Sequence, residues 1–245
     1  MLKFEDFYQQ SIQNQTRDDF WREQAKTVSW HQTPEQICDY SNPPFVRWFA
    51  DGELNLCHNA LDRHLTQRAN QPALIAVSTE TGSEKTYTYQ ELHAEVPRMA
   101  AALQSFGVGK GDRVQIYMPM IAEAAFAMLA CARLGAIHCV VFGGFASGSL
   151  ASRIEDAKPK VIVSADAGSR GGRVVAYKPL LDEALRLSSH QPDAVILANR
   201  GLAPMDLHPE RDHLWEDMRQ QFLDAQVPCT WLRSTDPSYI LYTSG

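Results

Sequence analysis

AIHCVVFGGFASGSLASRIEDAKPKVIVS, residues 136–164, contains two apolar segments separated by an amphipathic one. The pattern predicts a strand over 136–142, a helix over 147–157 and a strand over 160–164. The second strand is apolar on both of its faces, which is typical of a parallel strand that helices cover on two sides. The stretch therefore predicts a βαβ unit of a mostly parallel sheet.

The same alternation continues on both sides of this unit. Strands are predicted at 73–78, 85–89, 113–117, 194–198 and 239–242, and helices at 88–106, 121–134, 179–188 and 212–223. Thr88 and Glu91 form a capping box for the first long helix, and Tyr87 and Leu92 occupy the positions of a hydrophobic staple. We therefore predict an α/β fold over residues 71–245, with a mostly parallel sheet flanked by helices.

Residues 1–70 follow a different pattern. They are rich in aromatic and amide residues, and short helices are expected at 4–11, 17–25 and 59–68. We predict that this segment is a separate helical and extended N-terminal wrap.

Composition and charge exclude several classes of protein. The 245 residues are 44% hydrophobic, which supports a substantial buried core, and the net charge is −6. This charge gives no general attraction to nucleic acid or to an anionic membrane. The N-terminus has no uninterrupted apolar core of a signal peptide, and charged residues interrupt the most apolar stretch, 118–141. We expect a cytoplasmic protein.

The cysteines are scattered and odd in number. No CxxC pair suggests zinc or dithiol chemistry, so we expect reduced thiols and no metal site. The five positions are Cys38, Cys57, Cys131, Cys139 and Cys229.

The first candidate site follows the strand at 136–142. Gly143 and Gly144 permit a close approach to the backbone, and Ser147 is a candidate cap for a helix whose free N–H groups favour an anion. Because open α/β sheets bind ligands at the carboxyl ends of their strands, this turn is a candidate binding segment. A tight structural turn explains the same residues.

The second candidate site is SADAGSRGGR, which follows the strand at 160–164. Its glycines predict a mobile loop, and Arg170 and Arg173 are suited to grip phosphate. A solvated surface turn is the alternative interpretation.

The third candidate is Thr243, Ser244 and Gly245, which follow the last apolar strand. Hydroxyl and backbone N–H groups at such a position can bind a polyphosphate, although the three residues alone are a weak signal.

A dinucleotide-binding oxidoreductase is a third interpretation of the alternating strands and helices, and the position of the remaining glycine-rich segment argues against it. GVGKG at 107–111 lies between a helix and the next strand. A dinucleotide fingerprint requires its glycines between a strand and the next helix. The segment is therefore a helix stop.

Taken in order, four segments of the chain resemble successive blocks of the adenylate-forming acyl-CoA synthetases, specifically the short-chain acetate and propionate group. They are SNPPFVRWFADGELNLCHNALDRH, GDRVQIYMPM, ACARLGAIHCVVFGGFASGSLASRIEDAKPKVIVSADAGSRGGR and YILYTSG. NLCHNALDRH and SADAGSRGGR look more like the propionyl-CoA synthetases than the acetyl-CoA synthetases. The resemblance covers essentially the whole chain.

The resemblance implies a ligase reaction in two steps. Propionate or acetate and ATP, with Mg²⁺, give an acyl-adenylate and pyrophosphate, and the thiol of CoA then displaces AMP. Gly143 and Gly144 would lie beside the path of CoA, and Arg170 and Arg173 would contact its nucleotide and 3′-phosphate. Thr243, Ser244 and Gly245 would begin the phosphate loop of the ATP site.

In that group the rest of the phosphate loop, the adenine and carboxylate pockets and the C-terminal domain follow this point of the chain. We therefore expect an N-terminal fragment of the fold, without its C-terminal domain, catalytic residues or activity. Two alternatives stay open: a non-catalytic module that binds CoA or a nucleotide, and a parent acetyl-CoA synthetase. An incomplete sheet would expose an unpaired edge, which favours self-association.

Overall fold

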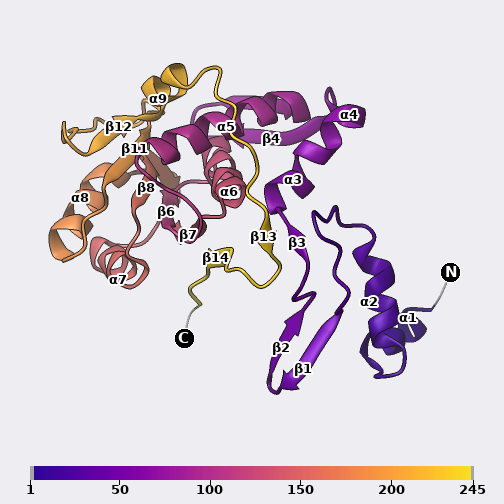
Figure 1. The fold of residues 1–245 in the computed structure, drawn as a ribbon. Coiled ribbons are helices and arrows are strands. Elements are labelled where there is room, and N and C mark those ends of the chain that lie inside the picture. The colour runs from indigo at the N-terminus through magenta and orange to yellow at the C-terminus, as the bar shows by residue number, and fades with distance from the viewer. Residues whose placement is uncertain (1–2, 244–245) are drawn as a thin grey trace.

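A six-stranded parallel sheet forms the centre of the computed structural model, which describes residues 3–243 (Figure 1). In spatial order its strands are β12 (Asp212–Leu214), β11 (Ala194–Ala198), β8 (Val161–Ala165), β6 (Arg113–Met118), β7 (Ile137–Phe142) and β14 (Tyr239–Ile240). Every neighbouring pair is parallel, so the carboxyl ends of all six strands lie at one edge. The α/β fold class predicted from the sequence is confirmed.

Helices cover both faces of the sheet and create two hydrophobic cores. Val161 and Val163 of β8 pack into the first core, whereas Ile162 between them packs into the second. This alternation explains why the strand is apolar throughout. The first core includes α5 (Tyr89–Ser105), α6 (Ala122–Leu134) and α9 (Trp215–Gln221), and the second includes α7 (Ser147–Ala157) and α8 (Tyr177–Leu187).

The start of α5 confirms the predicted capping box. The hydroxyl of Thr88 accepts a hydrogen bond from the backbone N–H of Glu91 at 3.2 Å, and the Glu91 carboxylate accepts one from the backbone N–H of Thr88 at 2.8 Å. Tyr87 and Leu92, the predicted staple residues, are both buried. Local sequence therefore fixes where this helix begins.

The N-terminal segment contains short helices and paired strands (Figure 1). α1, α2 and the β1–β2 hairpin lie away from the sheet, and β3 and α3 lead from them toward it. β3 pairs with the late strand β13 (Leu232–Arg233), which joins two segments that lie far apart in the sequence. The elements are α1 (Phe4–Ile12), α2 (Arg17–Ala25), β1 (Cys38–Asn42), β2 (Phe45–Trp48), β3 (Glu53–Leu54), α3 (Leu56–Ala60), η1 (Asp62–His64) and α4 (Leu65–Arg68).

The single helix predicted at 59–68 was wrong. The structure breaks it at Leu61, whose φ of −132° is not helical, into α3, a 3₁₀ turn and α4. The break turns Leu61 fully into the core and lets Asp62 form an ion pair with Arg133 of α6. Tertiary contacts therefore override the local periodicity here.

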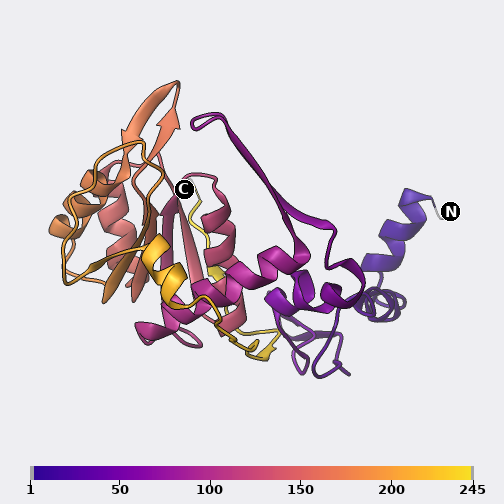
Figure 2. The same cartoon turned by 90° about the horizontal axis from the view of Figure 1, so that it is seen from above.

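Two hairpins extend on the same side of the molecule (Figure 2). They are β4 (Pro72–Ser78) with β5 (Ser83–Thr88), and β9 (Ala167–Arg170) with β10 (Arg173–Ala176). The second hairpin corrects the mobile loop predicted there. Gly171 and Gly172 have φ of 57° and 75°, so they form the tight two-residue turn that a hairpin requires.

The helix predicted at 212–223 also begins later than expected. Residues 212–214 form β12 at the edge of the sheet, and α9 follows. The reason is Asp212, whose buried carboxylate lies 2.6 Å from Arg211 and 3.0 Å from Lys178. These ion pairs hold the segment beside β11 in an extended form.

Within residues 3–243, no helix combines the length and the apolar character that a membrane crossing requires.

Replacing Thr88 with Ala tests the capping box. Because the backbone N–H of Glu91 loses its acceptor, we expect the free energy of unfolding to fall by about 1 kcal/mol, measured by urea denaturation. Thr88→Ser keeps the hydroxyl and is the matched control. Equal stabilities of the Ala and Ser variants would contradict the role of this cap.

Candidate functional site

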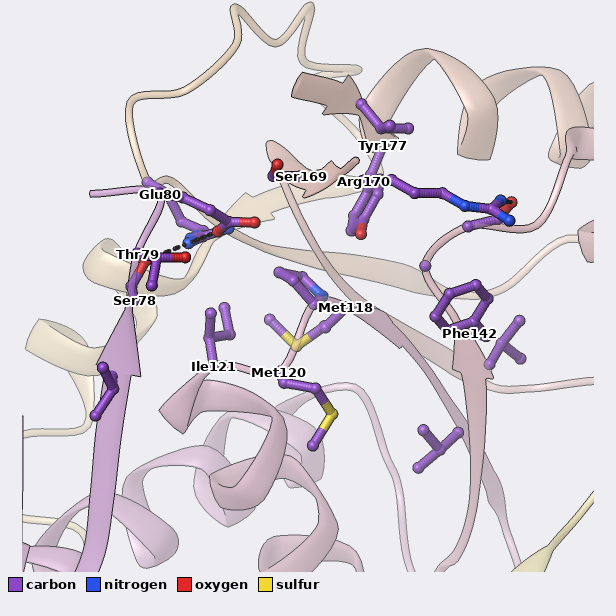
Figure 3. A pocket seen from close by; sticks show the side chains of 18 of the residues that line it. Ser78, Thr79, Glu80, Met118, Met120, Ile121, Phe142, Ser169, Arg170 and Tyr177 are labelled. Carbon is purple, nitrogen blue, oxygen red and sulfur yellow. Dashed lines mark hydrogen bonds and ion pairs between the residues drawn. The ribbon is translucent and has the colours of Figure 1, made fainter. Parts of the chain in front are cut away.

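A cavity of about 520 Å³ opens at the carboxyl edge of the sheet (Figure 3). Its walls come from the ends of β4, β6 and β7 and the segments that follow them, from the segment after β11, from β9 and β10, from the start of α8 and from the residue after β14. The lining residues are Val77, Ser78, Thr79, Glu80, Met118, Pro119, Met120, Ile121, Val140, Val141, Phe142, Gly143, Gly144, Ser169, Arg170, Val175, Tyr177, Arg200 and Leu241. The cavity thus brings together Gly143, Gly144 and Arg170, three of the residues singled out from the sequence.

Gly143 and Gly144 are glycines because protein side chains approach them closely. A Cβ atom on Gly143 would lie 2.3 Å from the hydroxyl oxygen of Tyr177. A Cβ atom on Gly144 would lie 2.4 Å from the ring of Phe142 and 3.0 Å from the guanidinium of Arg170. The turn after β7 therefore packs tightly against the other walls of the cavity.

The predicted helix cap at Ser147 was wrong by one position. Ala146, with extended backbone angles, occupies the capping position, and Ser147 is already the first residue of α7. Because Ala146 offers no side-chain acceptor, the first turn of α7 lacks a side-chain cap.

Arg170 lies across the turn after β7 (Figure 3). Its Nη1 atom donates a hydrogen bond to the carbonyl oxygen of Gly144 at 3.3 Å, and its guanidinium lies 5.9 Å from the centre of the Phe142 ring. Within residues 3–243, neither Arg170 nor Arg173 forms an ion pair with an acidic group. The edge of the cavity therefore carries an uncompensated positive charge.

Arg173 lies directly opposite Arg170 in the hairpin but does not line the cavity. Directly opposed residues of an antiparallel pair project from the same face, and two like charges there destabilise the pair. An anion bound between or beside them would relieve this repulsion. The hairpin thus carries two arginines for which no acidic partner is found among residues 3–243.

The last described residues come close to the cavity, but Thr243 does not line it. β14 pairs with the first half of β7, Leu241 lines the cavity, and Thr243 is exposed beyond it. The other two residues of the predicted phosphate loop, Ser244 and Gly245, lie outside the described residues.

Sequence reasoning missed Tyr177, because the helix was predicted to begin at residue 179 and it begins at Tyr177. This side chain is buried, and its hydroxyl fits between Gly143 and Gly168. Burial raises the pKa of Tyr177, so the hydroxyl stays protonated at neutral pH. It forms no hydrogen bond to another residue of the described chain and lines the cavity, where a donor is available to a ligand.

Sequence reasoning also missed the pair formed by Glu80 and Arg200 on the opposite wall. The guanidinium of Arg200 makes an ion pair with Glu80 and donates a hydrogen bond to the carbonyl of Ala167 at 2.9 Å. This pair neutralises its own charge and ties the tip of β4 to the strand that carries Arg170. The sequence offered one signal for this pair: Glu80 and Arg200 each follow a predicted strand, where ligand sites of α/β sheets are found.

A sequence model of the AMP-binding enzyme family matches residues 61–245. The chain belongs to this family. A second model, the acetyl-coenzyme A synthetase N-terminus, matches residues 4–60. Every segment described above therefore lies within one of these two matches.

The propionate–CoA ligase of Escherichia coli K12 is 54% identical to this chain, and the match covers 100% of this chain and 38% of the ligase. An acetyl-coenzyme A synthetase of Bradyrhizobium diazoefficiens is 46% identical over 99% of this chain and 37% of its own length. The chain thus spans well under half the length of these relatives, in their N-terminal part.

The fold of this family member agrees with that of a solved relative. Acetoacetyl-CoA synthetase from Streptomyces lividans superimposes with a TM-score of 0.88 at 26% identity, over 100% of this chain and 37% of that one. The chain therefore has the fold of the corresponding part of an adenylate-forming enzyme.

A methyl group at Gly143 tests how tightly the cavity wall is packed. Because its Cβ would lie 2.3 Å from the Tyr177 hydroxyl, we expect Gly143→Ala to lower the free energy of unfolding. The expected loss is about 1–3 kcal/mol, measured by denaturant titration. Gly148→Ala is the control, since nothing lies within 4 Å of a Cβ there. Equal stability of the two variants would show that Tyr177 does not pack on Gly143.

Proposed function

We propose that this chain forms the N-terminal part of an AMP-forming short-chain acyl-CoA synthetase that converts propionate, ATP and CoA into propionyl-CoA, AMP and pyrophosphate. The 54% identity to a propionate–CoA ligase supports propionate as the acid. An acetyl-CoA synthetase activity is the second candidate, supported by the 46% identity to an enzyme of that name.

The observation that carries this proposal is the uncompensated charge of Arg170 at the edge of an apolar cavity. CoA combines a negatively charged nucleotide with a long and largely uncharged pantetheine arm. The hairpin of Arg170 and Arg173 fits the phosphates, and the lining by Val140, Phe142 and Met120 fits the arm. The Tyr177 hydroxyl supplies a hydrogen-bond donor for a carbonyl of that arm.

Few of the described residues belong to the proposed ATP site. In this proposal Thr243, with Ser244 and Gly245 beyond the described residues, begins the loop that binds the phosphates. Mg²⁺ would accompany ATP and neutralise charge on the leaving pyrophosphate. The described residues support this proposal only up to Thr243: β14 pairs with β7, and Leu241 lines the cavity.

We also propose the cytoplasm as the compartment. All five cysteines are free thiols, which suits a reducing environment.

Calorimetry of CoA binding tests the role of the arginines. Because charge-assisted hydrogen bonds to phosphate are lost, we expect Arg170→Ala and Arg173→Ala each to weaken CoA binding by about tenfold or more. If Arg173 contacts the 3′-phosphate, dephospho-CoA binds the unchanged protein more weakly than CoA does.

The matched control is Arg186→Ala, since Arg186 is an exposed arginine on α8 whose partner is Glu183 at 2.7 Å. This variant should bind CoA like the unchanged protein. If Arg170→Ala behaves like Arg186→Ala, the hairpin is not the CoA site.

An activity assay tests whether the 245-residue chain catalyses the ligase reaction by itself. We expect no AMP release above background from propionate, ATP and CoA, because the chain corresponds to only 38% of the length of the propionate–CoA ligase that it matches. The assay couples AMP formation to NADH oxidation. Turnover that scales with the concentration of the pure chain would contradict this expectation, and CoA binding without turnover would support the alternative of a non-catalytic binding module.

A further inference from the structure

Two cysteines from distant parts of the chain meet beneath α3. Cys57 lies on α3 and is fully buried, and Cys229 lies in the irregular segment between α9 and β13. Their sulfur atoms and one carboxylate oxygen of Asp62 all lie within 4.8 Å of one another. Each sulfur is 3.8 Å from the Oδ2 atom of Asp62. Two thiols are therefore close enough to react with each other.

The guanidinium of Arg133 completes this cluster. Its Nη1 atom donates hydrogen bonds to Cys57 Sγ at 3.2 Å and to Asp62 Oδ2 at 3.0 Å, and its Nη2 atom donates to Asp62 Oδ1 at 2.7 Å. His93 lies on the other side, with Nε2 at 3.3 Å from Asp62 Oδ1. Arg133 itself is buried, so its charge acts over short distances with little screening by water.

This arrangement disfavours a metal ion and favours a thiolate. A metal ion bound by Cys57, Asp62 and Cys229 would lie beside the guanidinium of Arg133, and both carboxylate oxygens of Asp62 already accept hydrogen bonds from it. The same positive charge stabilises a negative sulfur. The cluster is therefore arranged for thiol chemistry.

The thiols differ in how readily they ionise. The hydrogen bond from Cys57 lowers the pKa of Cys229, and Arg133 adds to this effect. Burial raises the pKa of Cys131 to about 12 and that of Cys139 to about 11. Cys229 is also partly exposed, whereas Cys131 and Cys139 are buried. Cys38 is partly exposed as well, but its partial burial raises the pKa of its thiol. Cys229 is therefore the thiol that combines exposure with a lowered pKa and a neighbouring guanidinium, and we expect it to react first.

We propose that Cys57 and Cys229 form an oxidation site that hydrogen peroxide or another hydroperoxide converts into a reversible disulfide. Nothing in the proposed ligase reaction requires this site, which lies in a different part of the fold from the cavity at the carboxyl edge.

The reaction has two steps. The Cys229 thiolate attacks one oxygen of hydrogen peroxide, the O–O bond breaks, and the departing hydroxide takes a proton to become water; Cys229 becomes a sulfenic acid. The sulfur of Cys57 then attacks the sulfur of Cys229, the S–O bond breaks, and the departing hydroxide takes the thiol proton of Cys57. Two thiols lose two electrons, and the peroxide yields two waters. A dithiol reductant reverses the change.

Backbone contacts hold both partners at the same end of α6. The side-chain amide of Asn55 donates to the carbonyl of Ala132 at 2.7 Å and to that of Thr230 at 2.8 Å. The Nε atom of Arg133 donates to the carbonyl of Val227 at 2.5 Å. The sulfurs thus start within 4.8 Å of each other, and they must approach to about 2.05 Å to form the bond.

Peptide mapping tests this site on the purified protein with its full chain. The reduced protein is exposed to stoichiometric hydrogen peroxide, quenched with N-ethylmaleimide in denaturant and digested without reductant. We expect a linked pair of peptides that contains Cys57 and Cys229 and that dithiothreitol separates. We also expect free Cys229 to disappear about tenfold or more faster than free Cys139.

Variants separate the two steps. Cys57→Ser should stop the reaction at the sulfenic acid of Cys229, which dimedone then labels, whereas Cys139→Ser should still form the linked pair. Arg133→Met should slow the loss of free Cys229, and Arg133→Lys, which keeps the charge, should restore part of the rate. Circular dichroism checks that each variant is folded.

Three outcomes would overturn the proposal. The first is oxidation of Cys38 while Cys57 and Cys229 remain in separate alkylated peptides, since exposure alone would then control reactivity. The second is an equal rate for Cys229 and Cys139 in the unchanged protein. The third is protection of both thiols from alkylation by one equivalent of zinc, which would make the cluster a metal site.

Discussion

The parallel direction of all six strands is the constraint on which the candidate site depends. Parallel strands place every carboxyl end at one edge, and the segments that leave those ends must pass close to one another. Gly144 and Arg170 follow different strands, 26 positions apart in the sequence, yet they are joined by a hydrogen bond of 3.3 Å. β14, far later in the chain, adds Leu241 to the same cavity because it pairs beside β7.

Arg133 has a comparable role where the N-terminal segment meets the α/β body. A buried guanidinium is costly unless its donors are satisfied, and Asp62, Cys57 and the carbonyl of Val227 satisfy them here. These partners come from η1, from α3 and from the segment after α9. One side chain of α6 thereby fixes the relative position of three segments through hydrogen bonds and an ion pair. The sheet, in contrast, holds its helices through apolar contacts.

Local signals in the sequence predicted much of this fold, and contacts between distant residues account for what was missed. The capping box of Thr88 and Glu91 is contained in four residues, so the start of α5 could be predicted. The break at Leu61 depends on Arg133, and the tight fit of Gly143 depends on Tyr177, so neither was visible in a local pattern. The Gly171–Gly172 turn could have been predicted, because two adjacent glycines between short β-prone segments are typical of a hairpin, but the glycines were interpreted as a mobile loop. The meeting of Cys57 and Cys229 had no local signal at all.

The segment that carries Cys229 also connects the thiol cluster with the candidate site. After Cys229 it pairs with β3 at Leu232, whose side chain packs so closely on Gly135 that a Cβ there would lie 2.8 Å away. It then pairs with β7 through Tyr239 and Ile240 before Leu241 reaches the cavity. Three successive contacts therefore set the course of this segment: Cys229 with Cys57, β13 with β3, and β14 with β7. A disulfide would make the contact between Cys229 and Cys57 covalent. Because the two strand pairings are already formed, the bond would restrain the segment without requiring the cavity to change its shape.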